Sequence, residues 1–517
     1  MTTIKTSVNI PPEKGEDKET IKQAVANKLK VKIDDLEILK KSLDARDKKK
    51  IFYTYTVAAE TSQTDKALKN GGTVYERQRN YLSDITADLR YEGSRPIVIG
   101  AGPCGLFAAL TLAEMGAKPI IFERGDRVEE RKKKVAVFNS DLILDTESNI
   151  QFGEGGAGTF SDGKLNTGIN SVYVPAVLKE FVDNGAPEDV LYLNKPHVGT
   201  DKLETVVKSL REKIISKGGE FYFNTKVTDF IFTDGKIGGV RTTKGDFHGD
   251  RIYLCIGHSA RDTFYTLYGK GVVMAPKIFS MGVRIEHLQE DIDFSQYGRK
   301  RDILPPADYK TAVRLSDGNS LYSFCMCPGG TVVNASSEEK RICVNGMSNY
   351  ARDGVNANSA LLINVGEREY GEGTLAGIEL QRKIESAAYA ATGSYKVPVQ
   401  TFGGFMSGKT LDTGRIKPSV ATGYVLTDLN SFLPDFIKNG LKEGIPLIAR
   451  RIKNFDDKDA VLSGVEARSS SPVRIIRDDR CESSVKGLYP LGEGAGYAGG
   501  ITSAAADGIR GVVASLR

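Results

Sequence analysis

The sequence predicts an α/β protein of three parts: a domain built on a parallel sheet, an α+β domain inserted into it, and a small α+β domain at the N-terminus. Three observations support this. A chain of 517 residues is too long for one ordinary core. A glycine-rich turn follows a buried strand near residue 100, and a second one lies near the C-terminus, so one domain would use both ends. The expected parts are 1–94, 95–265 with 470–517, and 266–469.

The overall composition is that of a soluble globular protein, with 40% hydrophobic and 26% charged residues. No apolar run approaches the roughly 20 residues that a membrane span needs, and the N-terminus lacks the apolar stretch of a signal peptide. Six cysteines in a chain this long fit a reducing compartment. We therefore expect a cytoplasmic protein without a membrane partner. The four histidines lack metal-ligand spacing, so no metal site is expected.

The first part of the chain predicts the order strand, helix, strand, strand. A strand is expected at 4–10, a helix at 18–29, and two strands at 36–39 and 51–57. The charged run 40–50 between the last two could contact RNA, since aromatic residues follow it. However, its lysines are mixed with aspartates and the net charge is only +5, which favours a solvated hairpin. A nucleic-acid partner is thus disfavoured.

The glycine turn near residue 100 has the context of a dinucleotide-binding βαβ unit. A buried strand at 97–99 leads into the glycines, an apolar helix follows, and a second strand ends in Glu123, 18 residues after Gly105. The helix N-terminus would hold a diphosphate. Glu123 would accept ribose hydroxyls and repel a 2′-phosphate, which favours FAD or NAD over NADP. The expected contacts are Gly100, Gly102, Pro103, Cys104, Gly105, Glu123 and Arg124.

The C-terminal turn favours FAD over NAD. A strand runs into Gly492 and Glu493, and a small-residue helix begins near Gly500 and Ile501. In flavoproteins with a second glycine motif, the acid meets the ribitol and diphosphate, and the helix N-terminus faces the flavin. An aspartate is usual at this position, so Glu493 is a departure. Further contacts with a non-covalent FAD are expected at Gly158, Thr159, Val227 and Gly257. Since only one fingerprint is present, NADH or NADPH would be a transient donor.

Several longer motifs carry a resemblance to a known family. They are 153–165, 323–330, 344–348, 466–474 and the C-terminal glycine motif. On these the chain resembles a bacterial family of uncharacterised FAD-dependent dehydrogenases, the NAD(FAD)-utilising dehydrogenases. The resemblance covers nearly the whole chain. It implies a glutathione-reductase-like, Rossmann-type FAD domain with an inserted substrate domain, and it implies no substrate.

Two motifs supply candidate catalytic residues close to the flavin. The loop 153–165 has five glycines, which suits close approach to a planar ring, and its Lys164 could supply positive charge to reduced flavin or an acidic substrate. Cys325 and Cys327 would share one face of a strand within the strand-like stretch 321–336. They could form a redox pair, line the active site without redox chemistry, or simply pack as small hydrophobic residues.

Three basic side chains are further candidates. Arg468 and Arg474 flank a Ser-Ser-Ser-Pro stretch and could bind a carboxylate or phosphate over the flavin, or serve only in ion pairs. His258, on a loop at the cofactor side, could act as a general acid. The residues form no Ser–His–Asp or paired-carboxylate arrangement, which disfavours hydrolysis.

The sequence therefore predicts an FAD-dependent oxidoreductase that acts on a small-molecule substrate, which could be acidic, through flavin N5. The middle region, with a long helix expected at 366–392, should cover the flavin. Two alternatives stay open at this point: an FAD-dependent RNA-modifying enzyme, and a non-catalytic FAD-binding sensor whose N-terminal part binds a partner.

Overall fold

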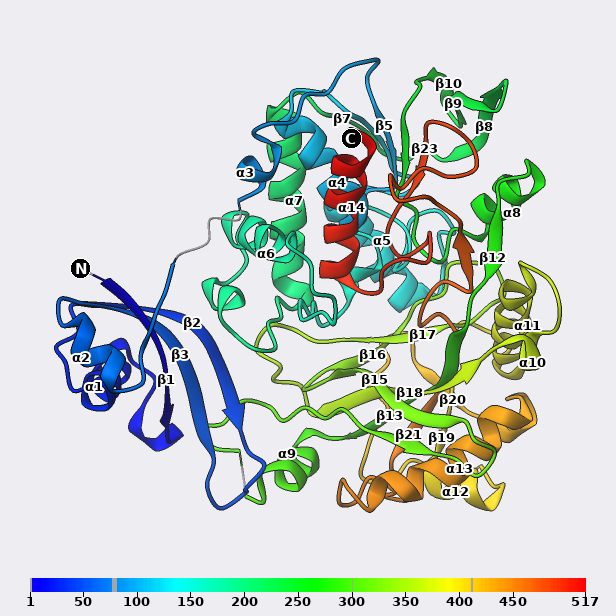
Figure 1. The fold of residues 1–517 in the computed structure, drawn as a ribbon. Helices are drawn as coiled ribbons and strands as arrows, with labels where there is room; N and C mark the ends of the chain where they lie inside the picture. Colours follow the sequence, from blue (N-terminus) through cyan, green and yellow to red (C-terminus); the bar gives the residue numbers. More distant parts are fainter. Residues whose placement is uncertain (1, 77–80, 300, 411) are drawn as a thin grey trace.

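The computed structural model describes residues 2–76, 81–299, 301–410 and 412–517. It is a mixed α/β protein in which three groups of elements follow one another along the chain and pack together (Figure 1). Within these residues, no helix combines the length and apolar character required to cross a membrane.

The N-terminal group is an antiparallel sheet with two helices on one face. Its strands are β1 (Thr2–Ile10), β2 (Asp35–Asp44), β3 (Phe52–Thr61) and β4 (Thr73–Val74), in the order β2-β3-β1-β4; its helices are α1 (Lys18–Leu29) and α2 (Thr64–Lys69). The apolar face of α1 (Ile21, Val25, Leu29) is fully buried against the sheet. The predicted strand–helix–strand–strand order is confirmed, but β2 continues through Asp44, so only the second half of the run 40–50 forms the turn between β2 and β3.

The β2–β3 hairpin reaches the rest of the molecule (Figure 1). Lys41 exchanges two backbone hydrogen bonds with Tyr192 (2.7 Å) and Asn194 (2.8 Å). Lys48 Nζ donates to the Ser295 carbonyl (2.7 Å), and Ile51 is buried in the core of the middle region. The lysine-bearing run thus has structural partners within the chain.

The second group is a five-stranded parallel sheet in the order β23-β11-β5-β6-β7, with a three-stranded antiparallel sheet beside it. The parallel strands are β5 (Ile97–Ile99), β6 (Ile120–Phe122), β7 (Glu220–Tyr222), β11 (Ile252–Leu254) and β23 (Leu488–Pro490), and the antiparallel ones β8 (Val227–Thr233), β9 (Lys236–Thr242) and β10 (Gly245–His248). The helices are α3 (Leu82–Thr86), α4 (Pro103–Glu114), α5 (Val128–Asp141), α6 (Val174–Asp183), α7 (Thr200–Ser216), α8 (Arg261–Gly269) and α14 (Ile501–Ser515).

The strand order brings the glycine turn after β5 and the C-terminal segment after β23 close together in the parallel sheet. β5 is central. β6 lies on one side of it and β11 on the other, with β23 beyond β11, so the order in which successive strands join the sheet reverses at β5. Helices α4 and α14 lie side by side over this point (Figure 1). They approach so closely that a Cβ on Gly508 would lie 2.3 Å from the Cys104 carbonyl oxygen. In open α/β sheets, ligands bind beyond the carboxyl ends of the strands at such a reversal.

The middle region is a seven-stranded sheet in the order β14-β15-β18-β13-β21-β19-β20. Its strands are β13 (Phe279–Leu288), β14 (Ala312–Arg314), β15 (Ser320–Cys327), β18 (Asn356–Val365), β19 (Val397–Thr401), β20 (Tyr424–Leu426) and β21 (Val461–Glu466); β16 (Thr331–Asn334) pairs with β17 (Val344–Met347). The helices are α9 (Gln289–Tyr297), α10 (Glu367–Tyr370), α11 (Ala376–Thr392), α12 (Phe402–Ser407) and α13 (Asp435–Ala449).

The two segments that connect the middle region to the parallel sheet lie side by side. β12 (Met274–Pro276) leaves the parallel sheet and pairs antiparallel with β22 (Val473–Ile475), which returns to it. One expectation is wrong here: the stretch 366–392 is two helices, because Gly371 (φ +79°) and Gly373 (φ +120°) adopt backbone conformations that no α-helix contains.

Candidate functional site

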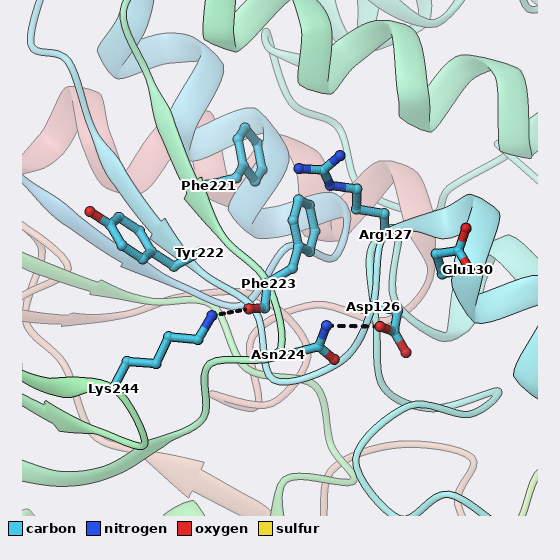
Figure 2. A pocket seen from close by; sticks show the side chains of 8 residues that line it. All are labelled: Asp126, Arg127, Glu130, Phe221, Tyr222, Phe223, Asn224 and Lys244. Carbon is cyan, nitrogen blue, oxygen red and sulfur yellow. Dashed lines mark hydrogen bonds between the residues drawn. The ribbon is translucent and has the colours of Figure 1, made fainter.

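A cavity of about 460 Å³ lies between the parallel sheet and the seven-stranded sheet. One side consists of the fingerprint turn, the end of β6, the loop after β11 and the start of α14. The other side consists of the end of β15 and residues that follow α9, β17 and β21. A second pocket of about 430 Å³ lies at the edge strand β7, where Lys244 donates to the Phe223 carbonyl and Asn224 to Asp126 (Figure 2). It contains none of the glycine-motif residues, so the first cavity is the candidate site.

The fingerprint turn owes its shape to glycines. Gly100, at φ +99°, allows the chain to turn out of β5, and a Cβ there would lie 2.6 Å from the Cys255 carbonyl oxygen. A Cβ at Gly105 would lie only 1.8 Å from the Gly100 carbonyl oxygen, so helix α4 can pack this closely only with glycine. The N-terminus of α4, at Gly102 and Pro103, therefore opens directly into the cavity.

Glu123, at the end of β6, is buried and holds the surrounding loops together. Its Oε1 accepts from the backbone N–H groups of Gly125 (2.9 Å) and Gly153 (3.0 Å), and its Oε2 accepts from Ala101 (2.9 Å). A carboxylate has about four acceptor positions, so Oε2 keeps capacity for a further donor. Arg124 beside it is occupied by Glu147 and Asp262, and its guanidinium stacks over the Phe152 ring.

The C-terminal motif contributes the N-terminus of α14 to the same cavity. Gly500 (φ +88°) precedes the first helical residue, Ile501, and both line the cavity. Gly158 packs against Ile501, since a Cβ there would lie 2.9 Å from the Ile501 Cγ1. The positive ends of two helices, α4 and α14, thus face one space, which is the arrangement that binds an anionic dinucleotide.

Glu493 and His258 form a half-buried pair in this wall. Glu493 Oε1 lies 3.6 Å from His258 Nδ1. Burial raises the pKa of Glu493 to about 7, and burial together with Arg468 and Arg261 lowers the pKa of His258 to about 3. The lowered pKa favours a neutral ring for His258, and the general-acid role stays a prediction. His258 Nε2 is buried without a hydrogen-bond partner in the described structure.

The two arginines of the 466–474 motif have different surroundings. Arg468 touches the cavity, but its Nε and Nη2 donate to the Glu385 carboxylate (2.8 and 2.7 Å) and its Nη1 donates to Ser259 (3.2 Å). Arg474 is exposed, lies outside the cavity lining and stacks over the Tyr497 ring. Arg468 is thus held in an internal ion pair, and Arg474 is a surface residue.

Of the remaining predicted residues, some line the cavity and others lie behind the lining residues. Lys164, Cys325 and Val227 line the cavity, as do Cys104 and Gly257. Cys327, Gly105, Thr159 and Gly492 lie behind the wall: the Gly492 N–H donates to Asp507 (2.7 Å), and the Thr159 carbonyl accepts from the Thr200 hydroxyl (2.7 Å).

Sequence reasoning missed the anchor of Lys164. Asp162 is buried, accepts from Lys164 Nζ (2.7 Å) and Arg352 Nε (2.9 Å), and also accepts from the Ser348 hydroxyl. Although burial opposes it, the two cations lower the pKa of Asp162 to about 2. Asp162 lies within the motif 153–165, and Ser348 ends the motif 344–348, so the two quoted motifs are joined by this carboxylate.

Arg284 is the other residue that no motif indicated. It is fully buried on β13 and pairs with Glu466 of β21 through Nε (2.6 Å) and Nη2 (3.1 Å). Its Nη1 donates to Asn358 (2.6 Å) and to the Cys325 carbonyl (3.2 Å). Arg284 therefore places a second cation under the cysteine end of the cavity.

The cavity fits FAD on its own features. Two helix N-termini face it, Gly102 leaves the backbone open to close approach, and an orphaned ring nitrogen at His258 awaits a partner. The cavity also extends from Lys226 and Val227 beside β6 to Met326 beneath the seven-stranded sheet, which suits an elongated ligand.

Comparisons with known proteins find matches to two family models and to several solved structures. Residues 278–469 match the family "FAD-dependent protein, C-terminal domain-like", and residues 2–60 match a domain of unknown function, DUF8436. Solved structures that resemble the chain include the flavin-dependent brominase Bmp2 (13% identity, 82% of this chain and 79% of that one, TM-score 0.38) and a glycine oxidase from Bacillus cereus (12%, 81% and 94%, TM-score 0.30). TM-scores this low establish no common fold.

A relative in sequence is much closer. An "uncharacterized protein" of Clostridium beijerinckii is 43% identical over 97% of this chain and 96% of its own length. The chain therefore belongs to the same family as this Clostridium beijerinckii protein.

Proposed function

We propose that the chain is an FAD-dependent oxidoreductase that binds FAD non-covalently and acts on a small molecule. The observation that carries this proposal is that one cavity is bounded by the fingerprint turn and the start of α14 on one side, and by β15 and the residue after β21 on the other. A dinucleotide held at the first wall would leave its reactive end next to the second. When bound, FAD would supply the acceptor for a hydride or an electron pair.

The residues of the first wall have distinct parts in this proposal. The N–H groups at the start of α4 would hold the diphosphate, and Glu123 would accept from the ribose through Oε2. The positive end of α14 would stabilise negative charge on a reduced flavin. Glu493, whose pKa burial raises to about 7, can take up or release a proton near neutral pH, and His258 lies beside it.

The second wall would select the substrate. Its lining includes the exposed Lys310 and the ion pair of Lys195 with Asp308 (2.8 Å). Lys164 and Arg352 share the single carboxylate of Asp162. The excess of positive charge on this wall favours an acidic substrate. We further propose that NADH or NADPH reaches the flavin as a transient donor from this side.

The test uses the purified full-length chain. We expect the flavin absorption bands in a 1:1 ratio of FAD to protein, release of FAD on denaturation, and bleaching of the bands by NADH or NADPH under anaerobic conditions. A protein that neither retains FAD nor takes it up when FAD is added would refute the proposal. A protein that holds FAD and yet is bleached by no donor but dithionite would refute the nicotinamide donor alone.

A further inference from the structure

Two cysteines meet the cavity at the end of β15, where the strand departs from regular pairing. Phe324 pairs with Ala360 of β18 and Cys327 pairs with Asn358, so Cys325 and Met326 together oppose Ser359. This is a β-bulge, which redirects side chains next to functional sites. Cys325 has φ +43°, in the left-handed region that non-glycine residues rarely adopt. The bulge turns Cys325 toward the cavity, which it lines, whereas Cys327 is fully buried.

The two cysteines are also joined by a hydrogen bond. The Cys327 Sγ donates to the Cys325 carbonyl at 3.3 Å. Cys325 lines the cavity, whereas Cys327, two residues further along the same bulge, is fully buried outside the lining.

Two cations surround this pair. Lys164 Nζ donates to the carbonyl of Met326, the residue between the cysteines, and is held in place by Asp162. Arg284 Nη1 lies 3.9 Å from the Cys327 Sγ and donates to the Cys325 carbonyl. The hydrogen bond from Cys327, assisted by the charges of Lys164 and Arg284, lowers the pKa of Cys325, while the pKa of Cys327 is raised.

A second thiol pair in the same cavity shows that proximity alone does not create this environment. Cys104 of α4 and Cys255 after β11 both line the cavity, and their side chains also hydrogen-bond. Burial, followed by the contact with Cys255, raises the pKa of Cys104 well above its usual range. Cys325 differs in that two cations, Lys164 and Arg284, donate to the carbonyls of Met326 and Cys325 itself, a setting that favours a thiolate.

We propose that Cys325 and Cys327 form a redox-active dithiol that exchanges an electron pair with FAD in this cavity, and that the substrate is a small disulfide or the corresponding thiol. This inference rests on the proposed function, because it requires bound FAD. It makes Cys325 the residue that meets the substrate and Cys327 the residue that resolves the mixed disulfide.

The chemistry balances without a further reactant at the dithiol. The Cys325 thiolate and the Cys327 thiol form one S–S bond and lose one S–H bond; FAD takes the electron pair and the proton and becomes FADH⁻. In the reverse direction, FADH⁻ opens that bond. The Cys325 thiolate then attacks a substrate disulfide, whose S–S bond breaks, and Cys327 releases the second substrate thiol. With a proton from water, FADH⁻ and one disulfide yield FAD and two thiols. A nicotinamide hydride donor would restore FADH⁻.

Electron counting in the holo-protein tests this inference without any substrate. The protein is oxidised with diamide, freed of reagent, and titrated anaerobically with dithionite while flavin absorbance is followed. Because a disulfide and a flavin each take an electron pair, the natural chain should consume about four electrons per FAD. Cys325→Ser and Cys327→Ser should each consume about two. Cys343→Ala, which removes a buried cysteine outside the cavity lining, should again consume about four.

Peptide mapping of the natural chain gives a second readout that needs no variant to fold. After diamide, Cys325 and Cys327 should resist iodoacetamide in denaturant and their peptide should lack two hydrogen masses; after dithionite, both should be alkylated. A variant gives a third readout. With reduced protein assayed near pH 4, below the lowered pKa of Cys325, Lys164→Met should slow alkylation of Cys325 roughly tenfold for each unit by which the thiol pKa rises.

The outcomes separate this inference from the proposed function. Absence of FAD binding would overturn the proposed function. Retention of FAD with about two electrons per flavin in the natural chain, or with an unlinked Cys325–Cys327 peptide after diamide, would overturn only the dithiol. About four electrons in both serine variants would also overturn it, because the second electron pair would then reside elsewhere.

Discussion

Substitutions at three glycines should distinguish effects on the stability of the fold from effects on the affinity for a dinucleotide. A Cβ at Gly102 would meet no atom of the protein closer than 3.7 Å, and the backbone there (φ −75°) is open to any residue. Gly102→Ala should therefore cost the apoprotein about 1 kcal/mol or less, the usual range for alanine at a helix N-cap. The methyl would nevertheless occupy the approach of a diphosphate to α4, so affinity for FAD should fall roughly 100-fold, about 2.7 kcal/mol.

Gly105→Ala should behave differently, because its methyl would lie 1.8 Å from the Gly100 carbonyl oxygen. Helix and turn would have to move apart by more than about 1 Å, and overpacking of this kind typically costs about 1–3 kcal/mol. Both stability and FAD binding should then suffer. Gly269→Ala is the matched control: it lies at the end of α8 with nothing within 4 Å, so it should stabilise by about 0.5–1 kcal/mol and leave FAD binding unchanged.

The measurements are urea unfolding of the apoprotein and titration of the apoprotein with FAD, followed by flavin fluorescence. Gly102→Ala should lower only the affinity for FAD, and Gly105→Ala should lower both the affinity and the free energy of unfolding. If Gly102→Ala binds FAD as tightly as the natural chain, the diphosphate does not lie at the start of α4. If Gly105→Ala is as stable as Gly102→Ala, the close contact between the helix and the turn does not constrain the fold.

Two further predictions concern buried charge. Burial raises the pKa of Glu493 to about 7, above its unfolded value. Through this group, the apoprotein should lose stability on the order of 2 kcal/mol between pH 4.5 and 8. Glu493→Gln should remove that part of the loss, and equal falls of the unfolding free energy with pH in both proteins, measured by urea unfolding, would contradict the prediction. Glu385 is fully buried and pairs with both Arg261 and Arg468. Glu385→Gln should therefore lower the free energy of unfolding by about 3–5 kcal/mol. An unfolding free energy within about 1 kcal/mol of the natural chain would show that the two guanidinium groups find other partners.

The local features of the site were predictable from sequence because short segments carry them. A buried strand, glycines at fixed spacing and an apolar helix form one βαβ unit whatever follows, so the fingerprint and the position of Glu123 could be placed directly. The start of α14 was predictable for the same reason, since a strand and a glycine turn precede it.

Charge partners were not predictable, because they come from segments far apart in the chain. Arg468 looked like an anion-binding residue, but Glu385 of α11 satisfies its guanidinium, and no sequence spacing relates the two. The pKa of His258 is lowered by burial and by Arg468 and Arg261, which the sequence near His258 does not reveal. Arg284 showed no motif at all, although it lies beneath Cys325.

The sequence by itself determined the kind of ligand this protein is built for, because recognition of a dinucleotide depends on backbone groups that glycines and helix starts expose within single turns. Only the tertiary structure decided the character of Cys325 and Cys327. Their reactivity depends on Lys164 from a distant loop, on Arg284 from another strand and on a bulge in β15, and these come together only when the seven-stranded sheet packs over the parallel one.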